Sequence, residues 1–357
     1  MKITTIAGRE LGPDLAAAWA ALQRADVDLS SPFFHPEFTR CVAGAKPNVE
    51  IAIVEDAGAV VALFPFERVL RSLGGPAGGP LSDYHGVVSA GGADADFAPL
   101  DLLRACKLIA WDFSRLPLSQ SRFQGQTQSL IESPRLELAD GFAAYAEHKR
   151  SSGSNLIERA SYSARRLARE IRPLRYAAHE VNSSLLDQVL AWKSAQYERT
   201  GKPDIFRLSW TRGLLTAIHQ TQTEGFAGVL STLHAGDELI AGHFGMRSNE
   251  SWHYWLPSYN RAHAKFSPGL ILILKMAESA SRLGVRVIDL GAGLSQHKAR
   301  LATGSVTLSA GSLELPTWRS MRRSVQRKIV ARVRNTPLEA PARAIARSWR
   351  ALGLSIY

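Results

Sequence analysis

Three side chains that could move protons, His243, Tyr259 and Asp289, are spaced along residues 228–293 of the chain. His243 stands in a predicted strand beside two glycines, which leave room for a ligand, and imidazole is well suited to proton transfer near neutral pH. Tyr259 follows the next predicted strand, and Asp289 ends a short apolar run that is typical of a buried strand. Acyl transfer to an amine or a hydroxyl needs such groups, because one proton is taken up and another is given to the leaving group.

Each of these residues also has a purely structural interpretation. A histidine within a strand is often a hydrogen-bonded core residue. A strand rich in aromatic residues often lines a core or a pocket, and the one that holds His253 and Trp255, with Tyr259 at its exit, is such a strand. Asp289 could anchor the amine of an acceptor, or it could bond the N–H groups of the loop that follows it. The sequence leaves both interpretations open.

A helix that begins at Ser267-Pro268-Gly269 could face a phosphorylated co-substrate. The first N–H groups of a helix have no partner within it, and the helix dipole favours anions at this end. Gly269 permits the close approach of a ligand, and Lys265 adds a positive charge just upstream. We therefore predict a phosphate site here, made by Lys265, Ser267, Gly269 and Leu270. An ordinary helix start after a loop is the alternative.

Five further residues could bind the substrate. In the first half of the chain a Gly- and Pro-rich loop precedes Asp83, Tyr84 and His85, and a cleft between two domains could recruit them. A turn motif is the alternative. Trp255 could form a wall of the same site. Lys298 could meet a phosphate or an acidic substrate, or it could be a solvated surface lysine.

The elements that must position these residues succeed one another with short connections. A Gly-Asp turn joins the strand that contains His243 to the strand before it, and Gly284 ends the helix that begins at Ser267. The predicted strands cover 174–181, 229–234, 239–247, 251–257, 285–290 and 306–315. The predicted helices cover 183–199, 209–224 and 267–283. This order predicts an α/β fold, in the form of an α+β mixed sheet with helices on both sides.

The chain divides into four parts on pattern and composition. The first part contains a hairpin with strands at 49–55 and 59–68, and it shares with the third part a loose order of helices before a hairpin, which indicates a duplicated fold. A basic helical connector separates these two units, and a basic helical tail follows them. The four parts cover residues 1–140, 141–175, 176–315 and 316–357.

The net charge of +11 is concentrated in the tail. Residues 316–357 contain ten Lys or Arg residues and one acidic residue, Glu339, whereas the rest of the chain is nearly neutral. Apolar residues that include Trp318 and Trp349 recur there every three or four positions, which predicts two basic amphipathic helices. Such helices suit an anionic membrane surface. Packing of the tail on its own body is the alternative, and no specific nucleic acid is expected.

The overall composition, 45% hydrophobic and 21% charged, is that of a soluble globular protein. Cys41 and Cys106, the only cysteines, are too few for a disulfide framework and wrongly spaced for a zinc site, so no metal is expected. The chain starts without the apolar core of a signal peptide, and its longest aliphatic run, 270–274, is too short to span a bilayer. We expect a cytoplasmic protein that contacts the inner face of the cell membrane where its tail binds there.

The chain resembles the BioF2-like acetyltransferases, often described as CelD-type cellulose-biosynthesis proteins, within the tandem-GNAT group that includes Fem-type peptidyltransferases. The resemblance covers about residues 30–300 and rests on these segments: Ser31-Pro32-Phe33-Phe34, Phe64-Pro65-Phe66, Leu81-Ser82-Asp83-Tyr84-His85-Gly86, Trp192-Lys193-Ser194-Ala195-Gln196-Tyr197, Ala241-Gly242-His243-Phe244-Gly245, Ser267-Pro268-Gly269 and Ile288-Asp289. The family often continues its last core strand into Gly-Asp-Glu-Pro-Tyr-Lys. Here Lys298 is kept, the acidic pair is absent and His297 replaces the tyrosine.

The resemblance implies two GNAT-like domains, of which 1–140 would be degenerate and 176–315 catalytic. It implies transfer of an acetyl or acyl group from acetyl-CoA or another acyl-CoA to an amine or a hydroxyl. The acceptor would be a small molecule or a glycan precursor in exopolysaccharide or cell-envelope biosynthesis. The thioester would lie where two neighbouring strands splay apart, here the strands of His243 and Tyr254, and Tyr259 would protonate the leaving thiolate.

Three other functions remain as alternatives. The donor could be an aminoacyl-tRNA, as in the Fem-type relatives that the chain resembles. Both units could have lost catalysis, which would leave a binding protein. The run at 287–293 also looks like the loop that holds S-adenosylmethionine in Rossmann-type methyltransferases, although that fold needs several strand–helix units after the motif.

Overall fold

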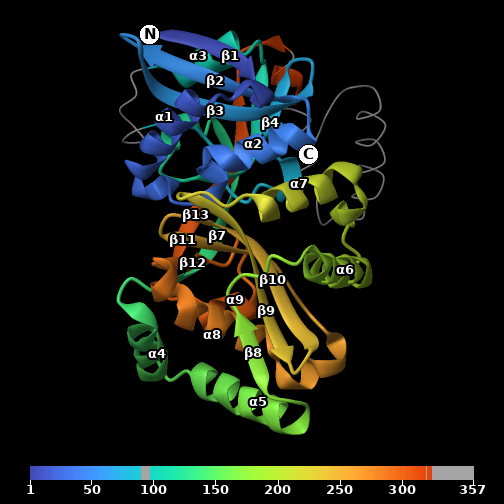
Figure 1. Ribbon diagram of the computed structural model, residues 1–357. Helices are drawn as coiled ribbons and strands as arrows, with labels where there is room; N and C mark the ends of the chain where they lie inside the picture. Colours follow the sequence, from blue (N-terminus) through green and yellow to red (C-terminus); the bar gives the residue numbers. More distant parts are fainter. Residues whose placement is uncertain (90–96, 319, 324–357) are drawn as a thin grey trace, which may run out of the picture.

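The computed structural model describes residues 1–89, 97–318 and 320–323. The part of the predicted tail helices that follows residue 323 therefore lies outside the described residues. Within the described part a thirteen-stranded mixed sheet runs through the whole molecule (Figure 1). Across the sheet the order is β1 (Lys2–Ala7), β2 (Val49–Asp56), β3 (Ala59–Leu70), β4 (Leu73–Pro76), β6 (Ala110–Pro117), β13 (Gly304–Glu314), β7 (Gln126–Glu137), β12 (Val287–Asp289), β11 (Ser251–Tyr259), β10 (Glu238–Ser248), β9 (Phe226–Ala235) and β8 (Leu174–Ala177), while β5 (Val88–Ser89) pairs with β3. The predicted mixed sheet is confirmed.

Each half of the sheet repeats one order of elements. The order is an edge strand, two helices, an antiparallel hairpin, a strand, a helix and a strand parallel to the one before the helix. In the first half these are β1, α1 (Pro13–Arg24), α2 (Pro36–Ala45), β2, β3, β4, α3 (Pro99–Ala105) and β6. In the second half they are β8, α6 (Ser183–Arg199), α7 (Ser209–Gln220), β9, β10, β11, α8 (Pro268–Ala280) and β12. The order of elements therefore bears out the predicted duplication.

The strand that follows each repeat in the chain pairs with the other repeat. β7 follows the first repeat but pairs with β12 of the second, and β13 follows the second repeat but pairs with β6 of the first. β7 and β13 also pair with each other along most of their length, which makes the sheet continuous between the halves (Figure 1). The register of β7 with β12 sets Arg135 opposite Asp289, so side chains from distant parts of the sequence meet there.

Helices cover both faces of the second half of the sheet. α6 and α7 pack with α1 and α2 on the face that carries Phe244 and Trp255. On the opposite face, α8, α4 (Gly141–Ser151) and α5 (Leu156–Glu170) cover Trp252 and Tyr254. Since neighbouring residues of a strand point to opposite faces, β11 divides its aromatic side chains between the two layers. Within the described residues, every helix is too short or too polar to cross a bilayer.

The Rossmann-type alternative is wrong. β12 has a parallel neighbour, β11, on one side and an antiparallel neighbour, β7, on the other, whereas the first strand of a Rossmann sheet lies among parallel strands. The Gly-rich loop after β12 instead binds the side chain of Asp289 at the end of that strand. Gly291 adopts a φ of +78°, and its N–H donates to Oδ1 of Asp289 at 2.8 Å.

Gly242 of β10 allows α6 to lie directly on the sheet, and its substitution gives a testable prediction. A Cβ at this position would lie 2.1 Å from Cγ2 of Val189 on α6. We expect Gly242→Ala to lower the free energy of unfolding by about 1–3 kcal/mol, because the helix must move outward. An added Cβ at Gly213 of α7 meets nothing within 4 Å, so Gly213→Ala should instead raise stability by up to about 1 kcal/mol. Denaturant unfolding of both variants checks this, and a Gly242→Ala protein as stable as the parent would contradict the packing.

Candidate active site

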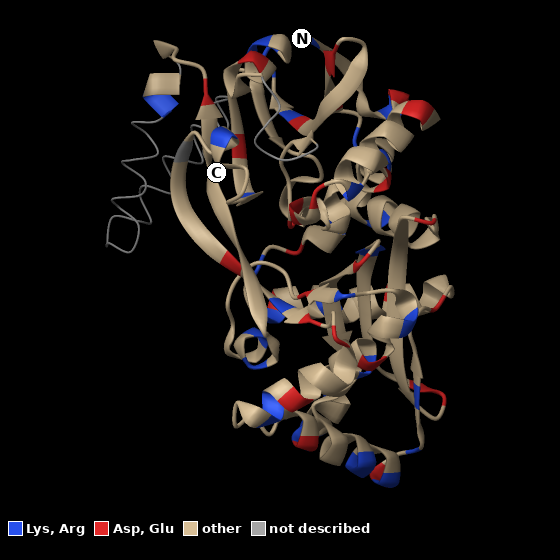
Figure 2. Cartoon of the chain, turned by 90° about the vertical axis from the view of Figure 1, so that its left-hand side faces the viewer, with Lys and Arg blue, Asp and Glu red and all other residues tan. Residues whose placement is uncertain are grey.

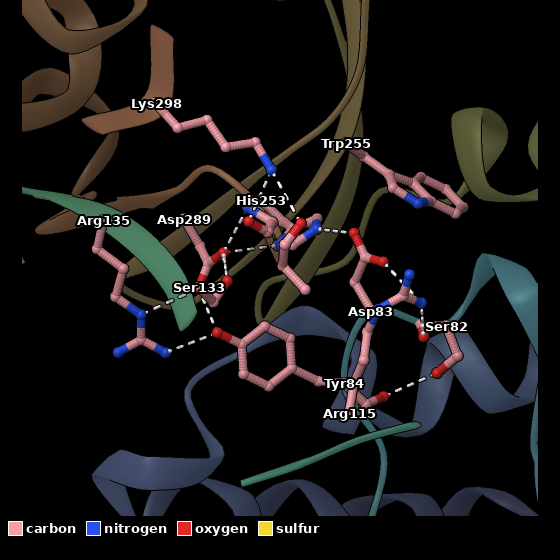
Figure 3. Close-up of polar contacts among 12 residues, drawn as sticks. Ser82, Asp83, Tyr84, Arg115, Ser133, Arg135, His253, Trp255, Asp289 and Lys298 are labelled. Carbon is pink, nitrogen blue, oxygen red and sulfur yellow. Dashed lines mark hydrogen bonds and ion pairs between the residues drawn. The ribbon is translucent and has the colours of Figure 1, made fainter. Parts of the chain in front are cut away.

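Asp289 is the centre of a buried polar network where the two halves of the sheet meet (Figure 3). Its Oδ2 accepts hydrogen bonds from the Tyr84 hydroxyl at 2.5 Å and from Nε of Arg135 at 2.9 Å. Its Oδ1 accepts from the Ser133 hydroxyl and from the Gly291 N–H, both at 2.8 Å. Ser133 and Arg135 are two residues apart on β7 and therefore share one face of that strand. With four donors the carboxylate is fully satisfied although only 1% of its surface is exposed.

The charges in this network stabilise one another. Burial alone would raise the pKa of Asp289, but the charges of His253 and Arg135 and the hydrogen bonds from Tyr84 and Gly291 hold it below its usual value. Burial and the neighbouring Asp289 raise the pKa of the Tyr84 phenol, so this hydroxyl stays protonated and donates. The pKa of Arg135 is raised by Tyr84 and Asp289 despite burial. The Asp289 site is therefore a fixed ion pair that holds the two halves in register.

His253 lies between Asp289 and a second carboxylate. Its Nε2 is 2.9 Å from Oδ2 of Asp83, and its Nδ1 is 3.5 Å from Oδ1 of Asp289. The imidazole is completely buried, and the ring of Phe33 meets it edge-on at 4.9 Å. Each ring nitrogen faces a carboxylate oxygen, so the imidazole lies between two negative charges.

Asp83 is the residue of the Asp83–His253–Asp289 network that reaches the surface. Nη1 of Arg115 lies 3.0 Å from its Oδ1, and the side chains of Asp83 and Arg115 are 17% and 28% exposed. Burial alone would raise the pKa of Asp83, but the hydrogen bond from His253 and the charge of Arg115 lower it overall. A base at this position would therefore be ionised at neutral pH and held in place by the imidazole that donates to it.

His85 holds the loop that presents Asp83. Its buried Nε2 accepts hydrogen bonds from the backbone N–H groups of Ser114 and Arg115 on β6, at 3.0 and 2.9 Å. Burial and then the charge of Arg115 lower its pKa to about 3, so the ring is neutral. His85, predicted to bind substrate, instead fixes the loop to β6. The predicted Tyr84 contacts Asp289, as described above.

The strands that part are β11 and β12, which corrects the expectation that the strands of His243 and Tyr254 splay. β10 and β11 stay paired from Ser248 opposite Ser251 to Ala241 opposite Tyr259, with one irregularity near Phe244. The parallel pair β11 and β12 is joined only over three residues, the last being His253 opposite Asp289. Beyond that point one edge of β11 is left without β12. The Asp83–His253–Asp289 chain lies where the two strands diverge (Figure 3).

His243 is packed into the sheet and lies outside this network. Its Nε2 accepts the Trp255 N–H at 3.1 Å, and its ring stacks on Tyr254 with centroids 4.6 Å apart. Burial lowers its pKa to about 3. The glycines beside it leave no room for a ligand, because Val189 fills the space at Gly242 and the His243 ring itself lies 2.6 Å from a Cβ placed at Gly245. This geometry supports the structural interpretation of His243.

The predicted phosphate site is at the start of α8, with fewer free donors than expected. Pro268 has no N–H, and the N–H groups of Leu270 and Ile271 bond the carbonyl of Ser267, which leaves the Gly269 N–H for a ligand. Ser267 has a left-handed φ of +52° and makes no capping bond with its side chain. Lys265 pairs with Glu170 at 3.2 Å. These residues fit one phosphate oxygen at Gly269 better than a diphosphate cradle.

Tyr259, Trp255 and Lys298 border the network at different points. Tyr259 ends β11, is 41% exposed, and its ring lies 3.8 Å from a Cβ placed at Gly269. Trp255 is buried against Phe33, with the two rings edge-on at 5.6 Å. Lys298 of α9 (Gln296–Leu301) is half-buried, and its Nζ donates to the carbonyls of residues 291 and 292 at 2.8 and 3.1 Å.

The network brings together three of the predicted residues, Asp83, Tyr84 and Asp289, with Lys298 at its border. Its central residue, His253, was considered only as part of an aromatic strand. Sequence reasoning missed three further residues, Arg115, Ser133 and Arg135. A weak signal for the last two was available, because they alternate along one segment. A strand near Arg135 to Leu138 is predicted and overlaps the end of β7, but Pro134 argues against a central strand that extends back through Ser133.

The first repeat contains a counterpart of Asp289. In both repeats the parallel pair begins with matched residues, Leu73 with Ala110 and Ser251 with Val287, and an aspartate follows two residues later on the second strand. This counterpart is Asp112, which accepts a hydrogen bond from the Ser312 hydroxyl of β13 at 2.8 Å and pairs with Arg323 at 2.7 Å. In both repeats a serine and an arginine hold the acid, and both come from the segment that crosses over from the other repeat: β7 in the second repeat, and β13 with the residues after it in the first. At the position of His253 the first repeat has Gly75, so it lacks the imidazole.

Residues 157–299 match the family model of an acetyltransferase (GNAT) domain. The matched segment holds α6 to α8 and β8 to β12, and therefore contains His253, Asp289 and Lys298. Asp83 and Arg135 come from outside it. A comparison with curated proteins finds no match.

Solved structures resemble the chain over almost its whole length. FemX is 12% identical with a TM-score of 0.59, over 91% of this chain and 100% of that one. The C-terminal DUF2156 domain of a putative lysylphosphatidylglycerol synthetase from Agrobacterium fabrum is 10% identical with a TM-score of 0.56, over 89% and 95%. L-PGS from Bacillus licheniformis is 11% identical with a TM-score of 0.54, over 88% and 96%. The chain therefore has a GNAT-type acyltransferase fold, built as two repeats.

Proposed function

We propose that the chain is a GNAT-type acyltransferase that moves an acetyl or acyl group from an acyl-CoA to an amine or a hydroxyl. The observation that carries this proposal is the divergence of β11 and β12 at His253 and Asp289, with Asp83 reaching the surface at the same point. The free edge of β11 supplies backbone groups for an extended thioester arm, as two parting strands do in this fold. The second repeat is the catalytic one in this proposal, since the first has Gly75 where the second has His253.

Asp83 acts as the base in the proposed reaction and is positioned by His253. The acceptor nitrogen or oxygen attacks the thioester carbonyl carbon, the carbon–sulfur bond breaks, and the acceptor's proton passes to the Asp83 carboxylate. His253 Nε2, 2.9 Å from Asp83, donates to this carboxylate and holds it in place. The leaving thiolate then takes up the proton that Asp83 has accepted. Tyr259 is six residues beyond His253 on β11, about 20 Å along the strand. It lies beside Gly269, at the phosphate end of the donor. Asp289 holds the imidazole in place without touching the substrate.

The acceptor and the setting follow from the resemblance to BioF2-like proteins. We propose a small-molecule or glycan-precursor acceptor in exopolysaccharide or cell-envelope biosynthesis. A cytoplasmic location, with the basic tail on the anionic inner face of the membrane, agrees with this setting.

A second donor is supported by one observation. The first turn of α8 leaves a single amide for a ligand and its neighbour Lys265 is paired with Glu170, so a diphosphate is held weakly there. An aminoacyl-tRNA carries its acyl group on a ribose and needs no diphosphate site. We keep this donor as the second candidate.

Thermal unfolding of the full chain with CoA, acetyl-CoA, an aminoacyl-tRNA or S-adenosylmethionine tests the donor. A ligand at 100 times its Kd adds about 2.7 kcal/mol of stability, which raises the midpoint by a few degrees at this size. We expect a shift with CoA and acetyl-CoA and none with S-adenosylmethionine. A shift with aminoacyl-tRNA alone would favour the second candidate. No shift with any of them would contradict both and leave a binding protein without catalysis.

A further inference from the structure

Three lysines gather beside the proposed base. The ammonium groups of Lys193 on α6 and Lys202 just after it lie 5.8 and 5.9 Å from the centroid of the Tyr197 ring. Lys298 approaches from α9. Its Nζ bonds the Gly291 carbonyl at 2.8 Å, and a Cβ placed at Gly291 would lie 3.1 Å from Oδ2 of Asp83, so Lys298 and Asp83 flank the same residue. The charge of Lys298 also contributes to the lowered pKa of Lys193. We refer to Lys193, Lys202 and Lys298 as the lysine cluster. Residues of both charge signs lie in this central region between the two halves of the molecule (Figure 2).

The lysine cluster has no paired acid. In the part of the chain that the structure describes, no carboxylate oxygen lies within 4.0 Å of these three ammonium groups, although Lys46 pairs with Glu67 and Lys265 with Glu170. Among the described residues, Lys298 donates to two backbone carbonyls, those of 291 and 292. Ammonium groups that are held close together, and repel one another, are stabilised when an anion lies between them.

Lys193 makes the strongest case, because it is 91% buried. Its Nζ donates to the carbonyl of Pro257 at 3.0 Å, and two of its three N–H donors remain for a ligand. Burial, and then the charges of Lys202 and Lys298, lower its pKa to about 8, so it is still largely charged at neutral pH. Burying such a charge against one carbonyl is costly without a counter-ion.

The position of the lysine cluster assigns the anion to the acceptor and not to the donor. α6 covers the face of the sheet that carries Trp255, and the ring of Phe33 links this face to His253. α8, whose start is the proposed donor phosphate site, covers the opposite face. An anion held by Lys193 therefore lies on the same face of the sheet as His253 and its partner Asp83.

We propose that the lysine cluster binds an anionic oxygen group of the acceptor, a carboxylate or a phosphate, and so places the acceptor's amine or hydroxyl against Asp83. This rests on the proposed acyl transfer for its purpose, but the anion site itself does not depend on it. It also gives a role to the segment Trp192-Lys193-Ser194-Ala195-Gln196-Tyr197, since Lys193 and Tyr197 line the site from one face of α6.

Calorimetric titration with inorganic phosphate and, separately, with acetate tests the anion site on the full chain. The variants are Lys193→Met, Lys298→Met and the solvent-exposed Lys202→Met, which keeps the test valid should the buried substitution prevent folding. The control is Lys149→Met, because Lys149 is equally buried and also donates to a lone carbonyl, that of Ala302, but lies outside the cluster.

We expect saturable binding of at least one probe to the parent and to Lys149→Met with the same Kd, and a loss of affinity of about tenfold or more in Lys193→Met and Lys298→Met. Unchanged binding in the cluster variants, or no binding to the parent, overturns the proposal. Displacement of the bound probe by CoA would assign the lysines to the donor and also overturn it. Lysine-dependent phosphate binding in a protein that shows no response to CoA would retain the anion site and contradict the acyl-CoA function, so the two failures are distinct.

Discussion

Asp83→Asn is expected to lower kcat/KM for acyl transfer by about 10²- to 10⁴-fold, the usual contribution of a positioned general base. The amide keeps the size of the side chain and its contact with Arg115 but cannot accept the acceptor's proton. The measurement is the release of CoA thiol from acetyl-CoA in the presence of amine and alcohol acceptors. Since Asp83 lies at the surface-reaching end of the network, the variant should fold and bind acetyl-CoA like the parent.

Two further variants make this prediction specific. Asp101→Asn alters an exposed acid on α3 that pairs with Arg104, remote from His253, and should leave activity unchanged. His253→Gln retains a donor toward Asp83 but removes the ring that lies between the two carboxylates, so it should lower the same activity by less than Asp83→Asn does. An Asp83→Asn enzyme within twofold of the parent would contradict the assignment of the base.

Asp289→Ala is expected to lower the free energy of unfolding by about 3–5 kcal/mol, because it leaves the buried guanidinium of Arg135 without its carboxylate. The substitution also removes the acceptor of the Tyr84 and Ser133 hydroxyls and of the Gly291 N–H. Denaturant unfolding measures the loss. The network joins β12, β7 and the loop of Tyr84, so its loss should weaken the contact between the two halves of the molecule.

The double variant Asp289→Ala/Arg135→Met separates the ion pair from the packing around it. With both charges gone, no unpaired charge stays buried, so the double variant should lose clearly less stability than the sum of the single losses. Additive losses, or a cost below about 1 kcal/mol for Asp289→Ala, would show that the pair does not hold the halves together.

Local pattern was sufficient for much of the second repeat. The Gly236-Asp237 turn and the flanking apolar runs predicted the hairpin of β9 and β10, and Gly284, with a φ of +67°, ends the helical segment after α8 as expected. Asp289 could be singled out because an acid that ends a buried strand requires partners.

Sequence pattern could not supply the partners themselves. Arg135 meets Asp289 because β7 crosses into the second half of the sheet. Local periodicity predicts where strands lie in the sequence but not their order across a sheet. β6 was not predicted at all. The surroundings of His243 could not be predicted for a related reason: two neighbouring glycines suggest space in the sequence, but α6 and the imidazole itself fill that space in the fold.

Hydrogen exchange of the full chain with and without acetyl-CoA tests most directly whether the donor binds where β11 and β12 diverge. We predict slower exchange on binding for the amides of residues 254–256, 258, 259 and 269, with no change over β4 and β6 of the first repeat. Slower exchange at β4 and β6 instead, or unchanged exchange throughout 254–271 at saturating acetyl-CoA, would contradict the account.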